Sequence, residues 1–311
     1  VYAELEGSYG IAATLADSTS PMLVEDADYK LDVSNIQRNL YRNDLSPIAD
    51  IITRKMGRMS FKHELRGGGS VGTESRMGRL LRGCTMVATT RGAAWWGAFL
   101  AAAQPNTPAV GWNAGGSLSA LTEPKTIHVQ VTTSGASGVA RCSIGYDDGT
   151  ATQTNVAMIS GSALSLSGGL AAATITPTWS GTLVAGQAWV ATAWPPGIQY
   201  LPSSDETAYG SLTIRMYKDG MAHLLTGAYG SYKINAQAGQ RATVEFAFTG
   251  FYNAPNDVPL PANPVFETTL PQQCELGRLH LDGFGVASPI GNICAVDTFS
   301  YDIGNKIDPR M

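Results

Sequence analysis

Regular alternation of apolar and polar residues marks the stretch between Leu212 and Thr249 as the most ordered pattern in the chain. Apolar side chains at residues 212–216 alternate with threonine, arginine and tyrosine, and the same period of two returns at residues 232–236 and 243–249. This period is typical of strands that bury one face. Asp219-Gly220 supplies a tight hairpin turn between the first two strands. The pattern predicts an antiparallel sheet with one face on a core and the other free for water, a neighbouring subunit or a solvated channel.

Three further elements are expected earlier in the chain. Residues 60–66 alternate between apolar and polar or charged side chains, which predicts a strand that stops at the run of three glycines after it. A short helix should follow, with Thr73 or Ser75 as its N-cap and Gly83 near its end. The apolar run Ala93–Ala103 is too short to span a bilayer and indicates a buried second helix.

A change of composition suggests an inserted domain. Residues 126–199 carry no formally charged side chains except Arg141, Asp147 and Asp148, and contain several alternating runs between Gly/Ser turns. Such a stretch indicates a small all-β module. The domain organisation that we expect is a main domain in two parts, 1–123 and 200–311, with the inserted module at 124–199.

The remaining segments show weaker patterns. Residues 1–57 have scattered charges and turn residues, and we expect them to be irregular. Prolines interrupt the segment after Pro255, which argues against a helix there. A last set of short strands is expected between residues 276 and 305.

Overall charge and composition exclude some classes of function. The chain has 21 basic and 25 acidic residues, a net charge of −4, which argues against a dedicated nucleic-acid binder. Only 15% of residues are charged and 35 are glycines, so much of the surface must be uncharged Ser, Thr, Asn and Gln. This composition suits a protein that is surrounded by copies of itself. No signal peptide or membrane span is expected, and the start at Val1 suggests processing or trimming.

Residues that often carry chemistry do not form a convincing site. The cysteines are too far apart for a zinc-ligand spacing, and free buried thiols are favoured over disulfides; they are Cys84, Cys142, Cys274 and Cys294. His63 lies on the apolar face of its strand, which favours a hydrogen-bonded core histidine over a metal ligand. His280 is expected to face solvent or a subunit contact.

Two short motifs have simpler explanations than ligand binding. The YDDGT motif at residues 146–150 lacks the alternating ligands of a calcium loop and favours a β-turn. GGGSVG at residues 67–72 lacks the Lys-Ser/Thr pair of a phosphate loop and favours a loop hinge. No GxSxG elbow is present. We therefore expect no enzyme activity and no catalytic, cofactor-binding or metal-binding residues.

Arginines are densest at Arg76, Arg79 and Arg82. Their spacing of three along a predicted helix favours a solvated face or a salt bridge between subunits over a row of phosphate contacts.

The ribbon LTIRMYKDGMAHLLTGAYGSYKINAQAGQRATVEFAFTGFYNAP resembles the C-terminal core of major tail tube proteins of long-tailed, siphovirus-type bacteriophages. In that family a Y-x-D-G hairpin leads to a G-x-x-G step, an A-G turn and an F-x-F-T-G-x-Y strand. The matching positions here are Tyr217, Asp219, Gly220, Gly227, Gly230, Ala238, Gly239, Phe246, Phe248, Thr249, Gly250 and Tyr252. SFKHELRGGGS, GRLLRGC and FSYDIGNKIDPR are similar to other family segments, so the resemblance covers roughly residues 1–112 and 200–311.

The resemblance implies a mainly β fold, namely a β-sandwich or partial barrel with a short flanking helix, long loops and an inserted small β domain. Family members are structural virion proteins that form hexameric rings, and the rings stack into a hollow tail tube, assembled in the host cytoplasm. Implied partners are other copies of the chain and the tape measure, tail terminator and baseplate proteins. DNA would pass through the lumen without specific binding, and no cofactor or membrane is involved.

Other functions remain open. Residues 126–199 depart from the simplest family members and look like a β module of phage tail and baseplate proteins, which we expect on the outer wall of the tube. The chain could therefore be a distal-tail, baseplate or secretion-type ring protein on the same fold. An unrelated sugar-binding or hydrolytic β protein is the third class.

Overall fold

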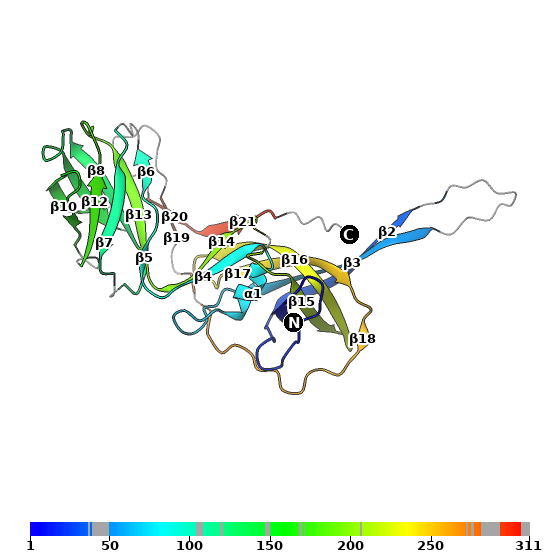
Figure 1. Ribbon diagram of the computed structural model, residues 1–311. Coiled ribbons are helices and arrows are strands. Elements are labelled where there is room, and N and C mark those ends of the chain that lie inside the picture. Colours follow the sequence, from blue (N-terminus) through cyan, green and yellow to red (C-terminus); the bar gives the residue numbers. More distant parts are fainter. Residues whose placement is uncertain are drawn as a thin grey trace, which may run out of the picture. The chain divides into compact units, whose positions relative to one another are not determined.

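The fold is mainly β, with one short helix, in the residues that the structure describes (Figure 1). The structure is a computed structural model that describes residues 1–36, 38, 50–103, 108–118, 121–146, 150–167, 170, 172–205, 207–271, 273–274, 277–280 and 293–305. It divides into two compact units. Unit 1 comprises Val1–Thr89, Ile198–Leu276 and Asp297–Met311, and unit 2 comprises Thr90–Gly197 and Gly277–Val296.

Unit 1 is built on an eight-stranded antiparallel sheet whose main order is β1-β15-β16-β17-β3-β2. Its elements are β1 (Tyr2–Leu5), β2 (Glu25–Ile36), β3 (Ile51–Glu64), α1 (Arg76–Arg82), β15 (Leu212–Lys218), β16 (Met221–Gln237), β17 (Thr243–Tyr252), β18 (Asn256–Asp257) and β21 (Thr298–Asp302). A separate two-stranded sheet pairs β4 (Met86–Arg91) with β14 (Gly197–Pro202), and both strands cross the unit boundary.

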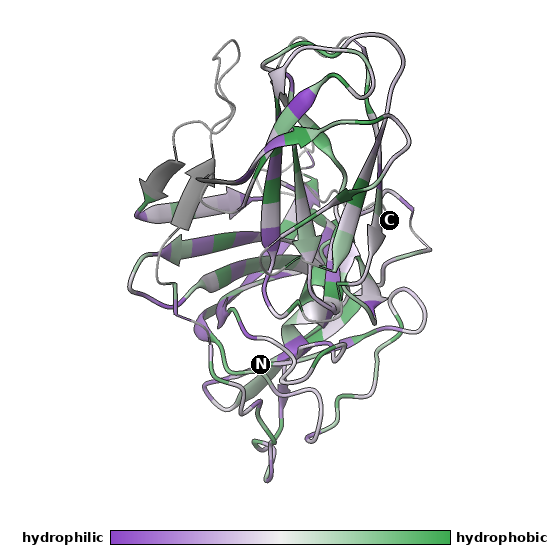
Figure 2. Cartoon of the chain, turned by 90° about the vertical axis from the view of Figure 1, so that its left-hand side faces the viewer, coloured by the Kyte–Doolittle hydropathy of each residue, from purple (hydrophilic) through white to green (hydrophobic). Residues whose placement is uncertain are grey.

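The predicted ribbon is present as β15, β16 and β17, and the alternation of hydrophobic and hydrophilic residues along such strands is visible in Figure 2. Asp219 and Gly220 form the expected turn, with φ angles of 52° and 80°. The predicted helix also forms, with Ser75 as its N-cap and Gly83 as its C-cap.

Strand β16 holds two parts of the sheet together. Its first part, Met221–Ala228, pairs with β15, and its last part, Lys233–Gln237, pairs with β21. Its other edge pairs with β17. Two strands, β17 and β3, separate β16 from β2 in the sheet, yet Tyr29 on β2 lies against His223 on β16 with 4.4 Å between ring centroids. The sheet is therefore curled. The result is a partial barrel around a core that includes Met59, Phe61, Phe246 and Phe248 on the sheet and Leu80 on the helix.

The prediction that residues 1–57 are irregular was wrong. They contain β1, β2 and the start of β3. Tyr29, Leu31 and Val33 alternate with polar residues in β2, but most of this strand is exposed, so its apolar face is weak.

Unit 2 is a β-sandwich of its own. One sheet has the order β10-β9-β8-β13-β5, with β6 also paired to β13, and a smaller sheet has the order β11-β12-β7. Side chains from both sheets share one hydrophobic core. The strands are β5 (Trp95–Trp96), β6 (Leu100–Ala103), β7 (Gly111–Gly116), β8 (Lys125–Thr133), β9 (Arg141–Tyr146), β10 (Thr150–Ala157), β11 (Leu164–Ser165), β12 (Ala173–Thr178), β13 (Ala188–Trp194), β19 (Gly277–His280) and β20 (Ile293–Val296).

The buried helix predicted at Ala93–Ala103 is absent, and β5 and β6 occupy this stretch. Trp95 pairs with Trp194 and their rings stack at 6.0 Å, so cross-strand partners override the helical preference of the alanines. Unit 2 consequently starts at Thr90, earlier than the expected boundary at 124, and it also takes a second segment, Gly277–Val296.

Candidate assembly interface

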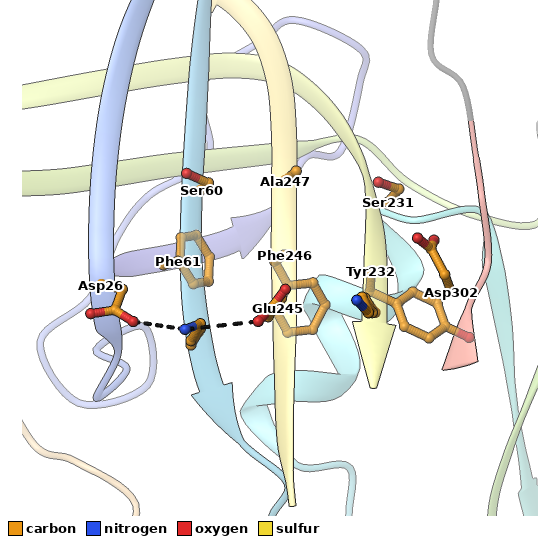
Figure 3. Close-up of a pocket in the computed structure, with 11 residues that line it drawn as sticks. Asp26, Ser60, Phe61, Ser231, Tyr232, Glu245, Phe246, Ala247 and Asp302 are labelled. Carbon is orange, nitrogen blue, oxygen red and sulfur yellow. Dashed lines mark hydrogen bonds and ion pairs between the residues drawn. The ribbon is translucent and has the colours of Figure 1, made fainter. Parts of the chain in front are cut away.

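The polar face of the unit 1 sheet carries a row of alternating charges across five strands. From β2 to β21 the row consists of Asp26, Lys62, Glu245, Lys233 and Asp302 (Figure 3). The Lys62 Nζ lies 2.8 Å from Asp26 Oδ2 and 3.8 Å from Glu245 Oε1. Pairing of β16 places Lys233 directly between Glu245 and Asp302. Each lysine thus has a carboxylate on both sides.

The row lines a shallow hollow of about 500 Å³, in which small side chains follow the charged ones. Ser60, Ala247 and Ser231 occupy the next cross-strand positions. The Lys62 and Glu245 side chains are 39% and 41% exposed, so water screens these charges strongly. This face therefore has a mixed, nearly balanced charge and belongs to the polar side of the sheet that the sequence predicted.

One edge of the sheet is already closed by the chain itself. The amide of Ala3 on β1 donates to the Ser20 carbonyl at 3.1 Å, and the amide of Met22 donates to the Val1 carbonyl at 2.8 Å. An isolated bridge pairs Tyr2 with Pro21. Residues next to β1 thus satisfy its outer backbone groups.

The outer edges of β2 and β21 have no strand partner within the described part of the chain, although Asp28 on β2 lies 3.7 Å from Lys218 on β15. β2 pairs with β3 alone, and β21 pairs with β16 alone. All five residues of β21 are exposed, as are most of β2. These strands are the two outer members of the series β2-β3-β17-β16-β21, so the sheet presents one open edge on each side.

β2 and β3 continue beyond the rest of their sheet as a two-stranded arm (Figure 1). The last β17 partner on β3 is Met56, whereas β2 stays paired to β3 as far as Ile51. Exposed apolar side chains gather here, with Val33, Ile36, Ile51 and Ile52 between 38% and 55% exposed. An isolated two-stranded ribbon is marginally stable in water, so this arm would gain from packing against another surface.

The residues that carry the family resemblance are spread over the sheet and do not form one site. Phe246 and Phe248 lie in the core, each 1% exposed. Gly227 has a φ of 56°, at a register irregularity between β16 and β17. Gly250 packs closely, since a Cβ there would lie 2.8 Å from the Thr226 carbonyl oxygen. Gly230 and Thr249 lie inside β16 and β17. The other positions lie in or near turns and strand ends, namely Tyr217, Asp219, Gly220, Ala238, Gly239 and Tyr252.

Glu6 is a structural residue that the sequence pattern did not reveal. Its carboxylate accepts hydrogen bonds from the Gly10 and Gly227 amides, both at 2.8 Å, and from the Ser211 and Thr213 hydroxyls at 2.6 and 2.8 Å. Thr213 is therefore buried, although its position in the alternation predicts the polar face. The N-terminal segment covers this end of the face and leaves the charged row as its open part.

The arginines of α1 make contacts within their own chain. Arg76 donates to the carbonyls of Ser18, Pro21 and Val265. Arg79 lies 2.7 Å from Glu4 on β1. These arginines hold the segment that closes the β1 edge, a role inside the chain beside the solvated face or subunit salt bridge that their spacing predicted.

Cys84, Cys142 and His63 are buried in the part of the chain that the structure describes. Cys84 and Cys142 are free and buried, and burial raises the pKa of both thiols, that of Cys142 to about 12. His63 is 3% exposed and its Nδ1 lies 2.6 Å from the Glu64 carbonyl oxygen, which confirms a core histidine. Burial lowers the pKa of His63. Asp147, Asp148 and the side chains of His280 and Cys294 lie outside the described residues.

Within the described ranges, no cluster of three or more His, Cys, Asp or Glu side chains has the arrangement of a metal site. In the same part of the chain, no helix is both long and apolar enough to cross a membrane.

Comparison of the chain with models of known protein families and with curated proteins gives no match.

Proposed function

We propose that this protein is a structural subunit that assembles with copies of itself into closed rings, and that the rings stack into a tube of the phage tail type, through which DNA is delivered. The observation that carries the proposal is the pair of open edges, β2 and β21, on opposite sides of one sheet. Open edges are a liability in a protein that stays monomeric, because they pair with other chains.

Opposite edges favour a ring over a simple dimer. When one edge of each copy pairs with a different edge of the next, the contact is head-to-tail, and such contacts close into rings if the rotation permits. The sheets then form a continuous barrel with no free edge. The arm, with its exposed Val33 and Ile36, would pack against a neighbouring copy in the same ring or the next one.

A conduit also needs a face that does not hold a polyanion. The charged row has a carboxylate on both sides of Lys62 and Lys233, which lowers their attraction for phosphate. This arrangement supports the placement of the row toward the lumen of the proposed tube.

A second candidate is another ring-forming component on the same fold, of the distal-tail, baseplate or secretion type. Unit 2 favours this second candidate, because it is a complete β-sandwich with its own core, and the wall of a tube can be formed by unit 1 without it. A sugar-binding or hydrolytic protein is the third class, and none of the described contacts favours it.

Negative-stain electron microscopy and analytical ultracentrifugation of the purified chain, over a range of concentrations, test the proposal. We expect hollow tubes, or rings that stack as the concentration rises. Rings that never stack would favour the second candidate. A chain that stays monomeric at all concentrations would contradict both assembly functions.

A further inference from the structure

We infer that β21 of one copy pairs with β2 of the next copy in parallel, in a register that brings Asp302 against Lys30 of the second copy. This inference rests on the proposed function, because it specifies the contact by which the ring closes. It assigns a role to two exposed residues that make no strong ion pair inside their own chain.

The parallel direction follows from the strand order. Neighbours in the series β2-β3-β17-β16-β21 are all antiparallel, so the first and fifth strands run in the same direction. Rotation about a ring axis keeps this direction in every copy. The strand that follows β21 around the ring is β2 of the next copy, and the two must therefore be parallel. A two-fold dimer through β2 would instead be antiparallel.

Charge decides the register. Asp302 ends the alternating row, with Lys233 directly opposite it on β16. The alternation continues into the next copy only if a cation on β2 faces Asp302, because like charges in opposite positions are destabilising. Of the five charged residues in β2, Glu25, Asp26, Asp28, Lys30 and Asp32, only Lys30 is a cation.

Lys30 is available for such a contact. Its side chain is 79% exposed, and the ion pair that it makes, with Asp28 on the same strand, is long at 3.4 Å. Asp32 is already paired with Arg58 at 2.8 Å. Lys30 lies on the polar face, since it pairs with Arg58 on the same side of the sheet as Ser60 and Lys62.

Asp302 is equally accessible. It is exposed, and its Oδ1 accepts a hydrogen bond from the Gly304 amide at 2.8 Å, which leaves Oδ2 for a second partner. Lys30 lies further along β2 than Asp26, the β2 member of the row. We call the contact between β21 of one copy and β2 of the next the seam. Pairing of Asp302 with Lys30 at the seam shifts the charged row of one copy along the strands relative to the row of the next, and strands must tilt and stagger to close any barrel.

Charge reversal tests the seam. Lys30→Glu and Asp302→Lys should each raise the concentration needed for assembly about tenfold or more, because each places like charges opposite one another in every seam. The double variant Lys30→Glu/Asp302→Lys restores opposite charges across the seam and should assemble at a lower concentration than either single variant. It should not match the original protein fully, because a lysine at position 302 lies opposite Lys233 in its own chain. Asp257→Lys, an exposed reversal on β18, is the matched control and should leave assembly unchanged.

Cysteine cross-linking gives a second readout that does not depend on charge. Within one chain, β2 and β21 are four strand spacings apart, roughly 19 Å along the sheet, which is too far for a disulfide. A Lys30→Cys/Asp302→Cys variant should therefore form a ladder of covalent oligomers on mild oxidation, whereas each single variant should stop at dimers.

The results separate the two proposals. Assembly with no ladder, or single reversals that assemble as well as the original protein, would overturn the seam and leave the proposed function standing. A chain that never assembles would overturn both.

Discussion

Glu267 caps the helix from a distant part of the chain, since its Oε1 accepts a hydrogen bond from the Arg76 amide at 2.6 Å. Ser75 holds the N-cap position, but its side chain makes no capping hydrogen bond. The proline-punctuated segment after β18 is thereby fixed to α1, and Arg76 strengthens the attachment through the Val265 carbonyl. A segment without regular structure thus has a defined position.

Glu267→Ala should therefore destabilise unit 1, while Ser75→Ala should have little effect. Loss of a helix cap costs about 0.5–2 kcal/mol. Ser75→Ala removes no capping bond, so a change within about 0.5 kcal/mol is expected. Urea denaturation followed by circular dichroism measures both. Equal losses in the two variants would show that Glu267 does not act as the cap.

Gly227→Ala should destabilise the sheet more than Gly239→Ala. Both glycines have positive φ, 56° and 77°, so each substitution strains the backbone by about 1–2 kcal/mol. A Cβ at Gly227 would also lie 2.9 Å from the Phe251 ring, whereas a Cβ at Gly239 meets open space. Thermal unfolding of the two variants gives the difference. Identical melting temperatures would mean that the contact with Phe251 relaxes at no cost.

Gly230, by contrast, does not have a positive φ. A Cβ there would lie 2.6 Å from the Ala247 carbonyl oxygen, so close strand packing accounts for this glycine.

Stability should fall as the pH drops below about 6.5, the ordinary pKa of histidine. Burial lowers the pKa of His63 in the folded state, so the unfolded chain binds a proton first and acid favours unfolding. The loss for this one group reaches at most about 1.4 kcal/mol per pH unit, and it ends once the pH is below the lowered folded-state pKa. Hydrogen bonding to Arg66 lowers the pKa of Glu64, so this neighbouring carboxylate takes up its proton well below pH 6.5.

Denaturation of the original protein and of His63→Phe between pH 7 and pH 5 measures this contribution. The variant keeps an aromatic ring in the core and removes the titrating group, so its stability should change less over this range. The same pH dependence in both proteins would assign it to other groups.

Duplex DNA should bind weakly or not at all at about 0.15 M salt, where non-specific DNA-binding proteins reach dissociation constants of about 10⁻⁴–10⁻⁶ M. Carboxylates flank both lysines of the charged row, so few phosphate contacts are available. Glu245→Gln/Asp302→Asn should bind DNA more tightly than Asp257→Asn, an exposed control outside the row. Fluorescence anisotropy with a labelled duplex measures all three. Submicromolar binding by the original protein that weakens steeply with salt would contradict the conduit.

The sequence predicted those parts of the fold in which local pattern and tertiary contacts agree. β15, β16, β17 and the Asp219-Gly220 turn follow from period-two alternation and turn chemistry, and α1 follows from its cap residues. In Ala93–Ala103, local preference favoured a helix, but Trp95 and Trp96 pair with β13, almost a hundred residues later. No local signal contains that information.

The candidate interface could be predicted only in part. Alternation identified a polar face, but the row of charges depends on the register of five strands, which the sequence does not specify. Glu6 was missed because its partners lie up to 221 positions away. A signal for β2 did exist, since Tyr29, Leu31 and Val33 alternate with polar residues, although their partial exposure makes the pattern weak.

The pairing of early strands with late ones sets an order of events during synthesis. Tyr2 pairs with Arg215, and Phe61 pairs with Phe246, so β1 and β3 leave the ribosome long before their partners exist. At about 5–20 residues per second, the wait is roughly ten to forty seconds. Thr90–Gly197, which holds nine of the eleven strands that the structure describes in unit 2, is made during this interval. A slower or stalled ribosome would therefore lengthen the period in which the first strands are exposed, and the yield of assembly-competent protein should depend on translation rate as well as on stability.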